Sequence, residues 1–183
     1  MSDPPFVIVS FALGLLRLVE LRHSRANEIK AGIVGIPGAA ASTYPAMVAL
    51  NIALFTMPLF EPRRARPRRF IAGLLLALAA TLRIWCIRSL GDQWNVRSAV
   101  PKELRVVGAG PYRFIRHPNY LAVAIEFCAL PLFGGAARSA VVLSLANAAV
   151  LWHRVSAEET MLGRSPEYRR IMGDKARFIP GLL

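Results

Sequence analysis

Residues 119–156 read NYLAVAIEFCALPLFGGAARSAVVLSLANAAVLWHRVS, and this stretch decides how the chain folds. Two apolar runs meet at Gly134-Gly135, with only a few residues between them. So short a connection predicts an antiparallel helical hairpin. The segments that precede and follow the hairpin, about 89–118 and 157–183, then emerge on the same side and can build one site.

The remaining sequence has the same apolar character, since 55% of the 183 residues are hydrophobic. These residues form long blocks, which favours membrane spans over the amphipathic helices of a soluble core. Five apolar segments stand out, at residues 5–21, 43–60, 70–88, 119–135 and 138–156. A helix needs about 20 residues to cross hydrocarbon, so several segments are short. We predict one all-α, polytopic transmembrane domain over residues 1–183, with about five spans.

The chain is strongly basic, with 23 Lys and Arg against 11 Asp and Glu and a net charge of +12. Most basic residues flank the apolar blocks, where phospholipid headgroups would lie, and no pattern of a nucleic-acid platform is present. If all five segments span, the side with residues 22–42, 88–118 and 154–183 holds most of the Lys and Arg. The positive-inside rule places that side in the cytoplasm. One compact cluster falls on the other side, against the rule: Arg63, Arg64, Arg66, Arg68 and Arg69.

Signatures of familiar soluble enzymes are missing. The sequence has no Walker loop and no GxSxG elbow, and Gly108-Ala109-Gly110 lacks the third glycine of a dinucleotide-binding loop. The three histidines and the two cysteines are far apart in the sequence, so neither a metal site nor a disulfide framework is expected.

A dense polar stretch, GPYRFIRHPNY from position 110, precedes the fourth apolar segment. Its last five residues, Arg116 to Tyr120, combine hydrogen-bond donors with stacking surfaces at a membrane boundary. Pro118 suits the first turn of a helix, whose N-terminus favours an anionic group such as a cofactor carboxylate. Composition alone is also compatible with an interfacial anchor, because Arg, Tyr and His are common where helices leave hydrocarbon.

A second constellation follows the fifth apolar segment, where the helix is expected to continue until Gly163. Arg154 and Glu158 are spaced i, i+4 and share one helical face, with Glu159 next to them. An ordinary surface ion pair has the same spacing. However, ionisable groups near membrane depth usually serve a partner or a ligand. The carboxylates would attract the α-amino group of a cationic sulfonium cofactor, and Arg154 could hold an anionic nucleophile.

Together, these features resemble the isoprenylcysteine carboxyl methyltransferase family. The resemblance rests on GPYRFIRHPNY, the helical hairpin, Arg154 with Glu158-Glu159, and the tail motifs PEYRR and RFIP at residues 166–170 and 177–180. It implies a multispanning methyltransferase whose S-adenosylmethionine is enclosed by the RHPNY segment and the loop before it. It also implies a variable pair of first spans, residues 1–69, and a cofactor- and substrate-binding core, residues 70–183.

The resemblance assigns roles to individual residues. Those implied to line the S-adenosylmethionine site are Leu104, Arg105, Val106, Val107, Tyr112, His117, Pro118, Asn119, Tyr120 and Glu158. Arg154 is implied to approach the substrate, and Arg116 and Glu159 complete the catalytic candidates. Glu159 or His117 becomes a candidate base if the acceptor is a neutral phenol.

The short chain and the segment LGDQWN at residues 90–95 are more similar to small bacterial members, which methylate long-chain polyketides. Ala122 replaces a glycine that is frequent in the family. The expected protein is an O-methyltransferase of the bacterial plasma membrane, with its site facing the cytoplasm. Its expected partners are membrane lipid and a lipophilic substrate, not nucleic acid. Its acceptor would be a lipophilic carboxylate, enol or phenol, such as an alkylpyrone or alkylresorcinol.

Three alternatives stay open. The acceptor could be the carboxylate of an isoprenylcysteine. A sterol-type membrane reductase that uses NADPH has a similar carboxyl-terminal helical arrangement, and a related fold does not fix the chemistry. A non-enzymatic scaffold could use its arginines to bind anionic lipid.

Overall fold

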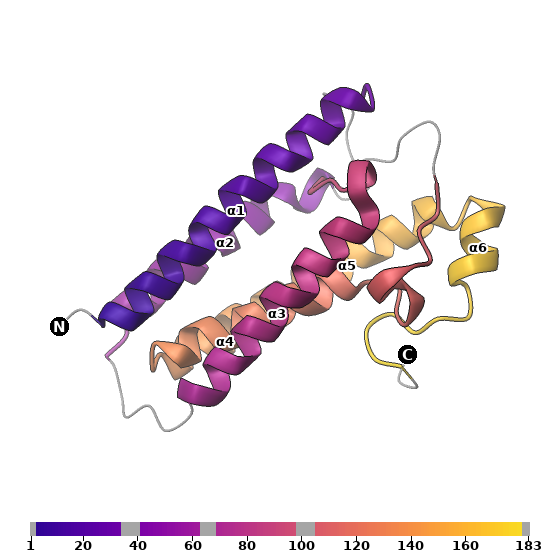
Figure 1. Ribbon diagram of the computed structural model, residues 1–183. Coiled ribbons are helices and arrows are strands. Elements are labelled where there is room, and N and C mark those ends of the chain that lie inside the picture. Colours follow the sequence, from indigo (N-terminus) through magenta and orange to yellow (C-terminus); the bar gives the residue numbers. More distant parts are fainter. Residues whose placement is uncertain (1–2, 34–40, 63–68, 98–104, 181–183) are drawn as a thin grey trace.

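Helices dominate the computed structural model, which describes residues 3–33, 41–62, 69–97 and 105–180 (Figure 1). The six α-helices are α1 (Pro4–Lys30), α2 (Tyr44–Phe60), α3 (Arg69–Leu90), α4 (Pro118–Phe133), α5 (Ala137–Leu162) and α6 (Pro166–Met172). Three 3-10 turns lie between them, η1 (Ala41–Thr43), η2 (Gly91–Gln93) and η3 (Gly110–Arg113). Within these ranges the β-structure consists of one isolated bridge. The predicted all-α fold is confirmed.

Among the described residues, four helical segments are long and apolar enough to cross a membrane: Pro4–Lys30, Ala41–Phe60, Arg69–Gln93 and Ala137–Leu162. Helix α4 is the shorter fifth segment. Its 16 residues cover about 24 Å, less than a hydrocarbon core of about 30 Å. The polytopic architecture is therefore confirmed, with α4 embedded among longer neighbours.

Helix α1 continues nine residues beyond its apolar run, which ends at Leu21, to Lys30. Hydropathy alone does not capture this extension because polar contacts stabilise it. Asn27 donates to the carbonyl oxygens of Gly91 and Trp94, at 3.0 and 2.9 Å, and Ser24 Oγ accepts from the backbone nitrogen of Val96 at 2.9 Å. The end of α1 is thus tied to the segment that follows α3.

The hairpin of α4 and α5 is confirmed. Gly134 caps α4, Gly135 adopts a left-handed φ of 79°, and α5 begins at Ala137. Figure 1 shows this turn at the same end of the molecule as the N-terminus and the start of α3. The ends of α3 and α5, the start of α4, and α6 gather at the opposite end, so the two polar stretches meet there.

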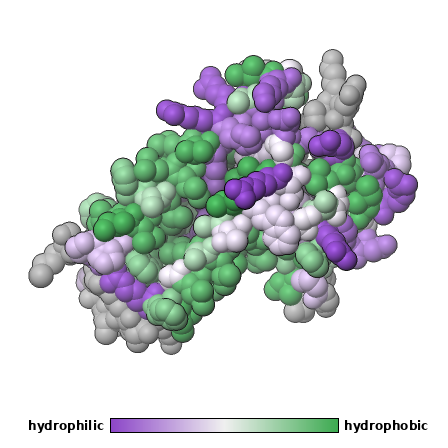
Figure 2. Space-filling view, in the orientation of Figure 1, coloured by the Kyte–Doolittle hydropathy of each residue, from purple (hydrophilic) through white to green (hydrophobic). Residues whose placement is uncertain are grey.

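Three hydrophobic clusters hold the described helices together. The largest joins all five long helices through Phe6, Leu54, Leu76, Phe127 and Leu143. The second joins Cys86 of α3 and Tyr112 of η3 to Tyr168 and Met172 of α6. The third joins Tyr120 of α4 to Leu151 and Val155 of α5. Figure 2 shows hydrophobic surface over the helical body, with hydrophilic residues concentrated towards the C-terminal end of α1 and towards α6. The apolar outer face is the surface a bilayer would cover.

Candidate functional site

The chain's tail pairs with the segment that leads into α4. The backbone nitrogen of Arg116 donates to the carbonyl oxygen of Ala176 at 2.9 Å, and that of His117 donates to Arg177 at 3.0 Å. Arg116 Nε also donates to the carbonyl oxygen of Lys175 at 2.7 Å. This pairing brings the tail alongside the RHPNY residues at the start of α4.

A tight turn in front of this segment requires glycine. Gly110 has a φ of 59°, and a Cβ at this position would lie 2.1 Å from Ser89 Oγ. A side chain there would therefore clash with α3 as well as strain the backbone. The turn packs Tyr112 against the end of α3.

Glu159 is the centre of a cluster that we call the carboxylate clasp, formed with Arg116, His117 and Arg177. One carboxylate oxygen lies 3.1 Å from both Arg116 Nη1 and His117 Nε2. The other lies 2.7 Å from Arg177 Nη2 and 3.0 Å from Arg177 Nε. Because both oxygens are engaged, Glu159 is better suited to positioning its neighbours than to accepting a proton from a substrate.

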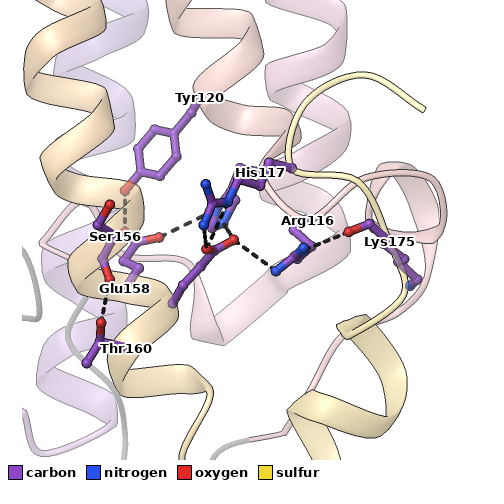
Figure 3. Close-up of polar contacts among 9 residues, drawn as sticks. Arg116, His117, Tyr120, Ser156, Glu158, Thr160 and Lys175 are labelled. Carbon is purple, nitrogen blue, oxygen red and sulfur yellow. Dashed lines mark hydrogen bonds and ion pairs between the residues drawn. The ribbon is translucent and has the colours of Figure 1, made fainter. Parts of the chain in front are cut away.

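Glu158 occupies the other side of the same imidazole (Figure 3). It accepts a hydrogen bond from the hydroxyl of Tyr120, and its second oxygen lies 3.8 Å from His117 Nδ1. The His117 and Tyr120 rings stack with centroids 5.7 Å apart. The Glu158 side chain is 14% exposed, so this carboxylate is framed by aromatic groups but still reaches the surface.

Two tyrosines near the clasp are held as neutral phenols. Burial, with the Cys86 thiol as a further cause, raises the pKa of Tyr112. Burial and the negative charge of Glu159 raise the pKa of Tyr168 to about 12. Neither phenol is therefore a candidate base near neutral pH.

Arg154 lies one helical turn before Glu158 and is 1% exposed. Its Nη2 donates to the carbonyl oxygen of Val96 at 2.9 Å, and its Cζ is 5.8 Å from the centroid of the Tyr120 ring. Arg154 also lines a cavity of about 520 Å³ bounded by all five long helices and by residues 94–96.

The cavity has a largely apolar body and a polar corner. Its apolar lining includes Leu15, Leu18, Met47, Ile52, Phe55, Val123 and Val150. Its polar lining beside Arg154 includes Tyr120 and the adjacent Asn119. The cavity can take a hydrocarbon chain with a polar head beside Arg154.

The structure brings together six of the residues that sequence reasoning selected: Arg116, His117, Tyr120, Arg154, Glu158 and Glu159. Pro118 is buried in the first turn of α4, and Asn119 lines the cavity. Val106 and Val107 pack on the cluster around Tyr112, and the backbone of Arg105 bonds to the Gln93 side chain. Leu104 lies outside the described residues, as do Arg63, Arg64, Arg66 and Arg68. The cofactor-binding and catalytic roles of all the selected residues stay predictions.

Sequence reasoning missed an ion network inside the apolar helices. We call it the interior quartet: Arg17, Glu20, Arg83 and Glu126. Arg17 pairs with Glu126 and, at 2.8 Å, with Glu20, while Arg83 Nε lies 2.5 Å from Glu20. The available signal was the presence of charged residues within predicted spans, which are costly there and usually functional. Reasoning from motifs also gave no role to Arg177 or to the segment Trp94–Val96.

Residues 71–164, just over half of the chain, match the isoprenylcysteine carboxyl methyltransferase (ICMT) family. The chain belongs to this family. The matched region runs from α3 through Glu159, so it contains most of the clasp, and the resemblance read from the motifs is confirmed.

A Bacillus subtilis (strain 168) protein, YpbQ, described as uncharacterized, is similar to the ICMT-family chain. The two are 29% identical over 150 residues, which covers 80% of this chain and 89% of YpbQ. Family membership and the four span-length helices together make the protein an integral membrane methyltransferase.

Proposed function

We propose that this ICMT-family protein transfers a methyl group from S-adenosylmethionine to an acidic oxygen of a lipophilic acceptor, at the cytoplasmic end of its helices. One observation carries the proposal: Arg154, at the polar corner of an apolar cavity, lies beside the Tyr120–Glu158 pair. An anion-binding group and a carboxylate framed by aromatic rings therefore meet where water and bilayer are both close.

The residues around Tyr120 fit a cofactor that carries an ammonium group. Glu158 offers a partly exposed carboxylate, and the buried Oδ1 of Asn119 has no hydrogen-bond partner among the residues described. Both are acceptors, which suits the α-amino group of S-adenosylmethionine. When bound, this cofactor would supply an electrophilic methyl carbon.

The chain's own residues then bind and align the acceptor. The Arg154 guanidinium would hold an anionic oxygen and the cavity would hold the hydrocarbon chain, which keeps water from the reacting atoms. Carboxylates and acidic enols are already largely ionised near neutral pH, so a strong base is unnecessary for them. The clasp would fix the His117 ring and the tail around the site.

The acceptor that we favour is a long-chain polyketide such as an alkylpyrone or alkylresorcinol, in a bacterial plasma membrane. The apolar lining of the cavity supports a long hydrocarbon chain in general. Isoprenylcysteine carboxyl methylation agrees with the family description and is the second candidate. A panel of these lipids with labelled S-adenosylmethionine would identify the acceptor.

Cofactor binding can be measured by calorimetry on the purified chain with S-adenosylhomocysteine. We expect Glu158→Gln and His117→Ala to weaken binding about tenfold or more, because hydrogen bonds to a charged group contribute about 1.5–3 kcal/mol. Glu167→Gln, an exposed change on α6, is the matched control. Unchanged affinity in the first two variants would contradict the assignment. Binding of NADPH instead would favour a reductase, and binding of neither would favour a scaffold.

Acceptor use should depend on Arg154. We expect Arg154→Ala to lower kcat/KM for the acceptor by about a hundredfold, because a buried charged contact is lost. Affinity for S-adenosylhomocysteine should stay close to that of the parent, which also shows that the variant is folded. Arg138→Ala, at the exposed far end of α5, is the control. Equal losses in cofactor and acceptor binding would contradict the assignment of Arg154 to the acceptor alone.

A further inference from the structure

The wall of the cavity that faces α3 carries two buried donors that the mechanism does not use. Arg83 and Trp94 both line the cavity, and they are 6% and 3% exposed. Arg83 Nη1 and Trp94 Nε1 have no hydrogen-bond partner within the part of the chain that the structure describes. The two groups are neighbours, because Arg83 Cζ lies 5.8 Å from the centroid of the Trp94 ring.

These donors are held in place by contacts on their other sides. Arg83 Nε is bonded to Glu20 at 2.5 Å, so one edge of the guanidinium is fixed. The carbonyl oxygen of Trp94 accepts from Asn27 at 2.9 Å, which anchors the backbone below the indole. A buried N–H group without an acceptor is costly, and such a group beside a cavity indicates a missing partner.

The pair lies close to Arg154, through the segment that follows Trp94. Arg154 donates to Val96, two residues after Trp94, and two residues of chain span at most about 7 Å. Arg83, Trp94 and Arg154 all line the same cavity. A small ring with oxygen atoms on two sides has dimensions of this order.

We propose that Arg83 and Trp94 form a second polar subsite of the acceptor cavity, which receives an acceptor oxygen that is not methylated. The inference rests on the proposed function, in which Arg154 holds the oxygen that is methylated. The acceptor class is a long-chain lipid whose ring carries two separated oxygen functions, one acidic and one a carbonyl or hydroxyl. A simple fatty acid has both oxygens on one carbon and would leave the two donors unused.

Two lipids of equal chain length test the subsite, a 5-alkylresorcinol and the corresponding 3-alkylphenol, which lacks one hydroxyl. Their binding to the full chain in detergent is measured by calorimetry without cofactor. The parent should bind the resorcinol about tenfold more tightly, as expected for one added hydrogen bond to buried donors. Trp94→Phe keeps the ring but removes the N–H, and it should abolish most of this preference.

Trp85→Phe is the matched control, because Trp85 is 47% exposed on α3, and it should keep the preference. Arg83→Lys removes Nη1 but retains a charge for Glu20, and it should lose the preference as Trp94→Phe does. Thermal unfolding of each variant verifies that it is folded.

Equal binding of the two lipids by the parent, binding of neither, or a preference that survives in both Trp94→Phe and Arg83→Lys would overturn the subsite. Because the binding assay needs no cofactor, its result is independent of methyl transfer. A preserved preference in the parent without any methyl transfer would instead count against the proposed function.

Discussion

The interior quartet and the carboxylate clasp both pair arginines with glutamates, but their charges are balanced differently. The quartet pairs two arginines with two glutamates, and the side chains of Glu20 and Glu126 are only 5% and 2% exposed. The clasp sets one glutamate, 13% exposed, against two arginines and a histidine. Charge is neutralised within the apolar helices, whereas an excess is tolerated at the end, where water and headgroups can solvate it.

This difference indicates different tasks. The quartet links α1 to α3 and α4, so it fixes the helix that forms one wall of the cavity. The clasp links the tail and the start of α4 to the end of α5. An internally neutral network holds helices together, and a network with surplus charge at an aqueous face is available to ligands.

The largest effect is expected from Glu126, the most deeply buried carboxylate of the two networks. Glu126→Leu leaves Arg17 with one partner fewer in an apolar environment, which should lower the free energy of unfolding by about 3–5 kcal/mol. The measurement is denaturant unfolding of the purified protein in detergent.

The double variant Arg17→Met with Glu126→Leu separates charge from packing. It leaves Glu20 with Arg83, a balanced pair, and should recover most of the lost stability. If the double variant is as unstable as the single one, the quartet is not the neutral unit that the comparison describes.

A smaller effect is expected at the clasp. Glu159→Gln removes the charge that holds Arg116 and Arg177, and bonds of this kind contribute about 1.5–3 kcal/mol. The amides around Ala176 should exchange faster with solvent, and kcat should fall about tenfold through misplacement of His117. Because Glu159 positions its neighbours, the shape of the pH–rate profile should not change. Loss of one limb of that profile would show that Glu159 is the base.

Much of the fold followed from patterns that one sequence displays. The apolar runs located the helices, and Gly134-Gly135 located the hairpin, because both are local features of the chain. The hairpin in turn predicted that the RHPNY residues would meet Glu158 and Glu159, and the hydrogen bonds of His117 and Tyr120 show that contact. Topology therefore supplied a long-range prediction where local patterns were strong.

Other parts of the site had no such signal. Arg17 and Glu126 are separated by 109 positions, and nothing in the sequence says which carboxylate an intramembrane arginine selects. The partner of Arg154 is a backbone carbonyl, that of Val96, and every residue has one. The approach of Arg177 depends on a single bridge between Ile115 and Ala176, too short to give a strand pattern.

The smallest effect is expected at a third carboxylate, Glu61, at the hairpin end. Its oxygens accept from the backbone nitrogens of Arg138 and Ser139, at 2.9 and 2.7 Å, and from the Ser139 hydroxyl at 2.7 Å. Burial opposes ionisation, but these hydrogen bonds outweigh it and lower the pKa of Glu61 below 4.5. The carboxylate therefore caps the start of α5 from outside the helix.

Glu61→Gln should cost about 1 kcal/mol of stability at neutral pH, the usual size of a helix cap. Because the folded state lowers this pKa, the contribution is present above about pH 4.5 and is lost as pH falls through the folded value. Thermal unfolding of parent and variant should differ at pH 7 and converge as the pH falls below the folded pKa of Glu61, whereas Asp174→Asn, an exposed control, should match the parent throughout. A difference that is independent of pH would mean that packing, and not the charge of Glu61, stabilises the start of α5. The stability contributions of Glu126, Glu159 and Glu61 would then not decrease in the order of their solvent exposure.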